Sequence, residues 1–275
     1  MARRKLEKFA DLHSYPNVYE YGYAELSSPE VAGQIAGGWS ERAFDEDRPL
    51  ILELGCGRGE YTVALAQQDV SHNYIGVDRK GARMWHGATE ALDKGLSNAA
   101  FLRTDINLLP LAFAPGEVSE LWITFPDPQM KRTRARLLSS AFLASYNRYL
   151  KPDGLVHLKT DSTFLYEYTL SLLEVNGIQP LVALPDLYQE EQLLTQYGIP
   201  RVLTHYEKQW LGRGKMIKYI RFALPMREQW LEPECEPEHD DYTSWSQVPG
   251  GLLHQVEQAF AQEESKLRPK NRNKI

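Results

Sequence analysis

Short apolar runs alternate with longer segments of helical periodicity between about residues 49 and 160. Runs of five to seven residues rich in aliphatic and aromatic side chains are typical of buried strands. The expected strands are residues 50–54, 73–78, 99–104, 120–125 and 154–160, with an alternating run at 215–224 as a late strand. The expected helices are residues 61–67, 80–95, 134–150 and 162–176. This alternation predicts an α/β fold, in which helices cover a mostly parallel sheet.

Composition changes this picture mainly at the C-terminal end. At 275 residues and 43% hydrophobic content, the chain can bury one α/β domain with appendages. Residues 228–241 hold seven acidic residues and no lysine or arginine, so removing them would change the net charge from −6 to +1. We expect this segment to be a solvated linker, followed by an amphipathic helix at 251–267 and a flexible basic end. The expected divisions are a basic and aromatic arm (1–39), a main domain (40–226) and the linker with its extension (227–275).

The sequence argues against a membrane protein and against a metalloprotein. Its apolar runs are strand-sized, and residues 1–13 lack the continuous hydrophobic segment of a signal peptide. Cys56 and Cys235 have no metal-type spacing and the seven histidines are scattered, so we expect neither a disulfide framework nor a metal site. We therefore expect a cytoplasmic protein with no membrane or metal partner. The sequence leaves monomer and homodimer open.

A glycine loop follows the first expected strand, in the sequence ELGCGRGEYT at residues 53–62. Glycine tolerates positive φ and lets the backbone approach a ligand closely. A dinucleotide-binding fingerprint spaces its glycines GxGxxG, whereas Gly55, Gly57 and Gly59 are spaced GxGxG. Glu53 lies two residues before the first of them. This arrangement favours a ligand with a positively charged amino-acid portion over a pyrophosphate.

Acidic residues end four consecutive expected strands along the chain. Glu53 ends the first strand, Asp78 the second, Asp105 follows the third and Asp127 follows the fourth. The carboxyl ends of parallel strands form the edge of an open α/β sheet where ligands bind. Each acid alone could cap a helix or a turn. Four in series favour a ligand site, in which Asp78 is placed to meet ribose hydroxyls.

The segment FPDPQMKRTRAR, residues 125–136, carries a fixed acid and a burst of positive charge. The prolines on both sides of Asp127 stop the strand and prevent a helix from beginning there. Four basic residues follow, Lys131, Arg132, Arg134 and Arg136. A fixed carboxylate beside these cations suits a polyanion that carries a group to be positioned for chemistry. The alternative is a solvated basic start of a helix.

These motifs together resemble the tRNA (guanine-N7-)-methyltransferase family within the class I S-adenosylmethionine-dependent methyltransferases. The glycine loop is similar to the first motif of that superfamily. More specific are the FPDP segment with its lysine, the KTD at 159–161 and the THYE at 204–207. The resemblance covers about residues 40–224. It implies a Rossmann-like class I methyltransferase fold, with a mostly parallel seven-stranded sheet, helices on both faces and a late antiparallel strand.

The resemblance also implies roles for individual residues. The expected substrate is tRNA, methylated at N7 of a guanine in the variable loop, position 46, with S-adenosylmethionine as cofactor. The expected cofactor-binding residues are Glu53, Gly55, Gly57, Asp78, Asp105 and Asp127, of which Asp127 is also catalytic. The expected substrate-binding residues are Lys131, Asp161, Thr204 and Glu207, and the expected RNA-binding residues are Arg132, Arg134 and Arg136.

Some features depart from the family pattern or allow another interpretation. Many members have tryptophan and histidine where this chain has Gln129 and Met130. The spacing of Thr204 and Glu207 also fits a capping box, which would give them a purely local role. An adenine-N6 methyltransferase is one alternative function, although its Asp-Pro-Pro-aromatic loop differs from Pro-Asp-Pro-Gln. A non-catalytic tRNA-binding protein is the other.

Overall fold

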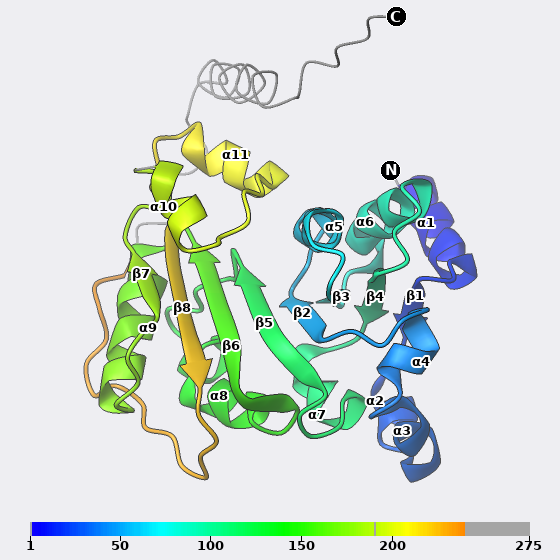
Figure 1. Cartoon of the computed structure of the whole chain (residues 1–275), viewed down its shortest axis with the longest axis horizontal. Coiled ribbons are helices and arrows are strands. Elements are labelled where there is room, and N and C mark those ends of the chain that lie inside the picture. The colour runs from blue at the N-terminus through cyan, green and yellow to red at the C-terminus, as the bar shows by residue number, and fades with distance from the viewer. Residues whose placement is uncertain (1, 190, 240–275) are drawn as a thin grey trace, which may run out of the picture.

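The computed structural model describes residues 2–189 and 191–239, and Figure 1 shows their arrangement. One mixed sheet runs through the described chain in the order β1-β4-β3-β2-β5-β6-β8-β7. The strands are β1 (Val18–Glu20), β2 (Leu50–Leu54), β3 (Asn73–Asp78), β4 (Ala99–Arg103), β5 (Val118–Thr124), β6 (Leu150–Thr160), β7 (Val182–Leu184) and β8 (Lys218–Leu224). The helices are α1 (Ala2–Ser14), α2 (Tyr23–Leu26), α3 (Pro29–Ile35), α4 (Trp39–Ala43), α5 (Glu60–Gln68), α6 (Gly81–Asp93), α7 (Leu109–Ala112), α8 (Ser140–Tyr146), α9 (Thr163–Val175), α10 (Glu191–Gln196) and α11 (His205–Leu211), with 3-10 helices at Ile106–Leu108 and Thr133–Ala135.

The pairing of the strands confirms the predicted fold class. Strands β1 to β6 pair in parallel, whereas β8 runs antiparallel to both β6 and β7. In Figure 1 the arrows of β5 and β6 point toward α11 and that of β8 points the opposite way. The described sheet has eight strands, one more than expected. The sequence pattern located six of them and missed β1 and β7, whose three residues each are too few to produce a readable alternation.

Two apolar clusters form on opposite faces of the sheet, because successive side chains of a strand point to opposite sides. On β5, Leu121 and Ile123 pack in the cluster that includes α8 and α9. Trp122, between them, packs in the cluster that includes Tyr61 of α5 and Met84 of α6. Every strand at the centre of the sheet is therefore buried on both faces, which explains its continuous apolar sequence.

The N-terminal residues pack against the sheet. Helix α1 lies along α6, and β1 pairs with β4 at the edge. The Trp39 side chain is fully buried, and its indole N–H donates to the Ala112 carbonyl at 2.8 Å. Residues 2–39 are thus tied to the main body of the fold, and the boundary at residue 39 stays a prediction.

The expected helix at 134–150 is shorter than the periodicity indicated. A 3-10 turn at Thr133–Ala135 is followed by extended backbone at Arg136, and α8 begins only at Ser140. The Ser139 hydroxyl caps that helix by accepting from the Phe142 N–H. The basic residues therefore lie in and around a 3-10 turn and not on an α-helix. The amphipathic helix expected at 251–267 lies outside the described residues.

The described part of the acidic segment, residues 228–239, lies across α8 and α9, and we call it the acidic strap. It has no helix or strand and is mostly exposed, as expected of a linker. However, the Glu232 carboxylate accepts from the Ser140 N–H at 2.8 Å and from the Tyr168 hydroxyl. The Leu231 N–H also donates to the Asn176 side chain at 2.9 Å. These contacts hold the strap against the domain, although it has no regular secondary structure.

Candidate active site

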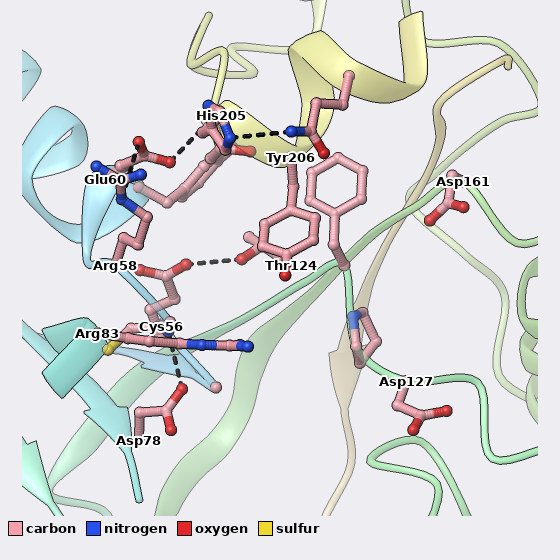
Figure 2. A pocket seen from close by; sticks show the side chains of 18 of the residues that line it. Cys56, Arg58, Glu60, Asp78, Arg83, Thr124, Asp127, Asp161, His205 and Tyr206 are labelled. Atoms are coloured by element: carbon pink, nitrogen blue, oxygen red, sulfur yellow. Dashed lines mark hydrogen bonds and ion pairs between the residues drawn. The ribbon is translucent and has the colours of Figure 1, made fainter. Parts of the chain in front are cut away.

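A cavity of about 800 Å³ opens at the carboxyl edge of the sheet, where the sequence placed its strand-end acids. Residues of the glycine loop, the ends of β3 and β5, the turn after β5, and α11 line it. A second hollow, of about 890 Å³, adjoins it on the side of Asp105. Gly55, Asp78, Phe125 and Asp127 line both hollows, so the two form one continuous groove. Figure 2 shows the first hollow at close range.

The glycine loop provides an open backbone surface in this groove. Gly55 and Gly57 have φ of +79° and +56°, in the left-handed region that favours glycine. A Cβ atom at Gly55 would meet no other atom within 4 Å, so the space above this residue is empty. The N–H groups of Gly55 and Cys56 both donate to the Val77 carbonyl, at 2.8 and 2.9 Å. The loop is thereby fixed against β3 with an open side for a ligand.

Glu53 lies at the base of the groove and is almost completely buried, with 3% of its surface exposed. Its carboxylate accepts from the Thr62 N–H at 2.9 Å, from the Thr62 hydroxyl, and from the Thr124 hydroxyl at 2.6 Å. Burial raises the pKa of Glu53 to about 7, although the hydrogen bonds from the two threonines oppose that rise. The acid therefore joins β2, α5 and β5 beneath the loop.

Asp78 and Asp105 occupy the positions expected of them. The two carboxylate oxygens of Asp78 accept from the Gly57 N–H at 2.9 Å and the Lys80 N–H at 2.8 Å. Asp105 caps the following 3-10 helix and pairs with Arg79 at 3.2 Å. Partial burial alone would raise the pKa of Asp105, but hydrogen bonds from Asn107 and Arg79 hold it below its ordinary value. Both acids thus line the groove in fixed orientations.

The turn that carries Asp127 is strained at both ends. Phe125 and Gln129 each have φ of +48°, which costs a residue other than glycine about 1–2 kcal/mol. The Phe125 N–H donates to the Lys159 carbonyl at 2.7 Å, and the Gln129 N–H donates to Asp127 Oδ1 at 3.1 Å. Asp127 is itself exposed. In Figure 2 Asp127 and Asp161 lie across the pocket from Asp78 and Cys56.

The basic residues after this turn divide into two kinds. Lys131, Arg132 and Arg134 are exposed, and the two arginines line the second hollow. Arg79, Lys80 and Arg83 line the same hollow. Arg136, by contrast, is fully buried and pairs with Glu236 of the acidic strap at 2.9 Å. The expectation that Arg136 contacts RNA directly is therefore wrong for this conformation, because its guanidinium does not reach the surface.

The expected substrate residues on α11 also differ from one another. Thr204 lines the pocket, and its hydroxyl caps α11 by accepting from the Glu207 N–H at 3.2 Å. Glu207 is fully buried and forms an ion pair of 2.7 Å with Lys159, which is also fully buried. Burial lowers the pKa of Lys159, opposed by the nearby Glu207 carboxylate. The local capping role is therefore present, and Glu207 faces Lys159 where a substrate contact was expected.

Several pocket residues were not predicted from the sequence. Glu60, the first residue of α5, accepts from the backbone N–H of His205 at 2.8 Å and so joins the glycine loop to α11. Tyr206 is 46% exposed and lines the pocket with His205 and Trp210. Figure 2 shows His205 and Tyr206 above Thr124. No local pattern reports the contact of Glu60 with His205, because 145 residues separate the two.

Among residues 2–189 and 191–239, no three or more histidine, cysteine or acidic side chains are grouped so that they could hold a metal ion. No helix in that part of the chain combines the length and apolarity needed to cross a membrane.

Comparison with known proteins gives consistent results. A family model described as a putative methyltransferase matches residues 47–220. A protein of Bacteroides thetaiotaomicron named tRNA (guanine-N(7)-)-methyltransferase is 48% identical over 246 residues, which are 90% of this chain and 96% of that protein. Proteins with the same name are 48% identical in Porphyromonas gingivalis, over 86% of this chain and 96% of theirs, and 47% identical in Christiangramia forsetii, over 81% and 99%.

Proposed function

Because the chain belongs to the tRNA (guanine-N(7)-)-methyltransferase family, we propose that it transfers a methyl group from S-adenosylmethionine to N7 of a guanine in tRNA. We further propose that the guanine is at position 46 of the variable loop, as the family resemblance implies. A tRNA substrate agrees with the cytoplasmic location expected from the sequence. The observation that carries the proposal is the position of Asp127, on a strained turn between the glycine loop and the exposed cations.

The chain's own residues fit S-adenosylmethionine. The empty space over Gly55 leaves room for a ligand against the backbone, beside the buried acid Glu53. Asp78 and Asp105 present carboxylates further along the same groove, at positions suited to hydroxyl and amine donors. When bound, the cofactor supplies an electrophilic methyl group on a sulfonium. We assign Glu53, Gly55, Gly57, Asp78, Asp105 and Asp127 to its site.

The acceptor nitrogen places modest demands on the protein. Guanine N7 has an exposed lone pair and no proton, so the reaction needs no strong base, and orientation of the base supplies most of the acceleration. Asp127 is exposed at the groove, and its Oδ1 accepts a hydrogen bond from the Gln129 N–H. We assign to it the acceptance of hydrogen bonds from the guanine edge and the offset of positive charge developing on the purine.

The RNA backbone is expected on the exposed cations. Lys131, Arg132 and Arg134 are accessible beside the groove and suit phosphate oxygens, which position RNA without reading its sequence. Asp161 and Thr204 line the pocket and are assigned to the substrate side.

The product of the reaction tests the proposal directly. Labelled cofactor and bulk tRNA should give N7-methylguanosine in the nucleoside digest, and a tRNA transcript with adenine in place of G46 should not be labelled. Asp127→Ala should lower kcat by about 10²-fold or more at saturating cofactor. The matched control is Asp153→Asn, an exposed acid near the N-terminal end of β6, away from the groove. Unchanged methylation by Asp127→Ala, or recovery of N6-methyladenosine, would contradict the proposal.

The RNA assignment has a separate test. Replacing both Arg132 and Arg134 by glutamine should weaken tRNA binding and lower the slope of log K against log salt by about 2. Lys151→Gln, which removes an exposed charge at the far end of β6, is the control. Equal salt slopes for the double variant and the wild type would assign these arginines to solvation alone.

A further inference from the structure

Arg136 is an unusual residue for a basic cluster, because the fold buries it completely. Its guanidinium carbon lies 4.7 Å from the ring centroid of Phe164 and 4.4 Å from that of Tyr168, both on α9. A buried guanidinium is stable only where its N–H groups and its charge are satisfied. The groups that satisfy Arg136 therefore indicate its role.

Two of those partners are backbone carbonyls of the catalytic turn. Arg136 Nε donates to the Gln129 carbonyl at 3.3 Å, and Nη2 donates to the Met130 carbonyl at 2.8 Å. Gln129 is one of the two strained residues of the turn, and its N–H holds Asp127 Oδ1. Arg136 thus fixes the carbonyl of the same residue whose N–H orients the Asp127 carboxylate.

The third partner comes from the acidic strap. Glu236 Oε1 lies 2.9 Å from Arg136 Nη1 and accepts from the Thr133 hydroxyl at 3.1 Å. Nη1 makes no aligned hydrogen bond in the described structure, so the contact with Glu236 is an ion pair. The arginine lowers the pKa of Glu236 through this contact, against a smaller opposing effect of burial. In Figure 1 the strap runs up beside α9 to reach this end of the sheet.

We propose that Arg136 is a positioning residue for the turn that carries Asp127, and that Glu236 of the acidic strap supports this role as the counter-ion of Arg136. The inference rests on the proposed function for its kinetic consequence. In structural terms, Glu236 and Arg136 together hold the Gln129–Met130 backbone. The competing possibility is that Glu236 covers an arginine that binds an RNA phosphate when the strap leaves.

The shape of the guanidinium favours the positioning role. One planar fork reaches two successive carbonyls while its faces lie on aromatic rings, which the ammonium of a lysine cannot reproduce. A phosphate ligand would tolerate lysine, because a point charge suffices for counter-ion release. Arg136→Lys therefore separates the two possibilities.

The first experiment compares Arg136→Lys with the wild type in the full chain. We expect kcat at saturating tRNA and cofactor to fall about 10²-fold, since a turn displaced by about 1 Å loses that much. The dissociation constant for tRNA and its salt slope should stay within twofold. Full retention of kcat by Arg136→Lys would overturn the proposal, as would a Kd for tRNA that rises while kcat is kept.

A second variant keeps the test decisive even if Arg136→Lys does not fold. Glu236 is 37% exposed, so Glu236→Gln should fold, and it should lower kcat about 2- to 5-fold, as expected for a partly solvated ion pair. Glu234→Gln removes an exposed acid of the same strap and is the matched control, with kcat expected to be unchanged. Tighter tRNA binding by Glu236→Gln alone would show instead that the strap covers a phosphate site.

Limited tryptic digestion provides a readout that does not depend on activity. Lys131 and Arg132 are exposed in the turn, and cleavage there reports how often the turn opens. Glu236→Gln should be cut there about 2- to 5-fold faster than Glu234→Gln, in the absence of cofactor and tRNA. Equal cleavage of the two variants would overturn the inference. A failure of the wild type to form N7-methylguanosine would overturn only the proposed function.

Discussion

Replacing Glu53 by glutamine should remove one contribution to the dependence of the free energy of unfolding on pH. Glu53 is buried beneath the glycine loop, and its pKa is raised from 4.5 to about 7. Because the folded value lies above the unfolded one, the folded chain binds this proton more tightly. The resulting stabilisation is complete below about pH 4.5 and is lost as the pH rises through 7. A shift of this size corresponds to about 3 kcal/mol.

Glutamine fits the same site without a titrating proton. Its carbonyl can accept from Thr62 as the carboxylate does, and its amide can donate to the Thr124 hydroxyl once that hydroxyl turns. The free energy of unfolding of Glu53→Gln, minus that of the wild type, should therefore increase by about 3 kcal/mol from pH 4.5 to pH 8. Urea unfolding at several pH values measures both terms.

A control variant and a contradicting outcome test whether the burial of Glu53 causes this difference. Glu228→Gln removes one exposed acid from the strap and should give a difference that does not change over this range. If the Glu53→Gln difference were equally flat, Glu53 would keep an ordinary affinity for its proton in the folded state. Hydrogen bonds from Thr62 and Thr124 would then outweigh its burial, contrary to our account of the site.

Substitutions at three other positions test local assignments. Glu207→Gln should lower the free energy of unfolding by about 3 kcal/mol in urea, because Lys159 is left as a buried charge with a weaker partner; a changed KM for tRNA at unchanged stability would make Glu207 a substrate ligand instead. Gln129→Val should cost at least about 1 kcal/mol, whereas Gln129→Gly should cost none, since the left-handed φ penalises a branched side chain. Thr204→Ala should cost about 1 kcal/mol by removing the cap of α11, and Thr204→Ser should restore it; equal losses would exclude the cap.

The sequence was sufficient for features that depend on nearest neighbours along the chain. Continuous apolar runs located the central strands, because strands buried on both faces need no polar side. The strand-end acids then had to share one edge, because parallel strands end on the same side. Asp78, Asp105 and Asp127 all line the groove for this reason. The cap of α11 by Thr204 was likewise readable from its spacing to Glu207, although the Glu207 side chain pairs with Lys159 and does not complete a capping box.

Features that depend on distant partners could not be predicted in this way. Arg134 and Arg136 are equivalent members of a basic run in the sequence, yet one is exposed and the other buried. The difference is made by aromatic residues of α9 and by Glu236, a hundred residues further along the chain. The pairing of Glu207 with Lys159 has the same origin. A count of local charge cannot distinguish these cases, because burial is decided by tertiary packing.

The position of the strap also restricts where tRNA can bind. In the sequence, seven acidic residues lie within 228–241, and the remainder of the chain has a net charge of +1. In the structure, Glu236 accepts a hydrogen bond from Thr133 and remains 37% exposed. In the sequence Thr133 lies between Arg132 and Arg134, which are both exposed. A phosphate approaching from the strap side would meet a carboxylate, which is unfavourable. The groove beside Asp127 is lined instead by five cations, Arg79, Lys80, Arg83, Arg132 and Arg134. The RNA backbone should therefore enter along the groove, which brings a guanine toward the acid that is expected to receive it.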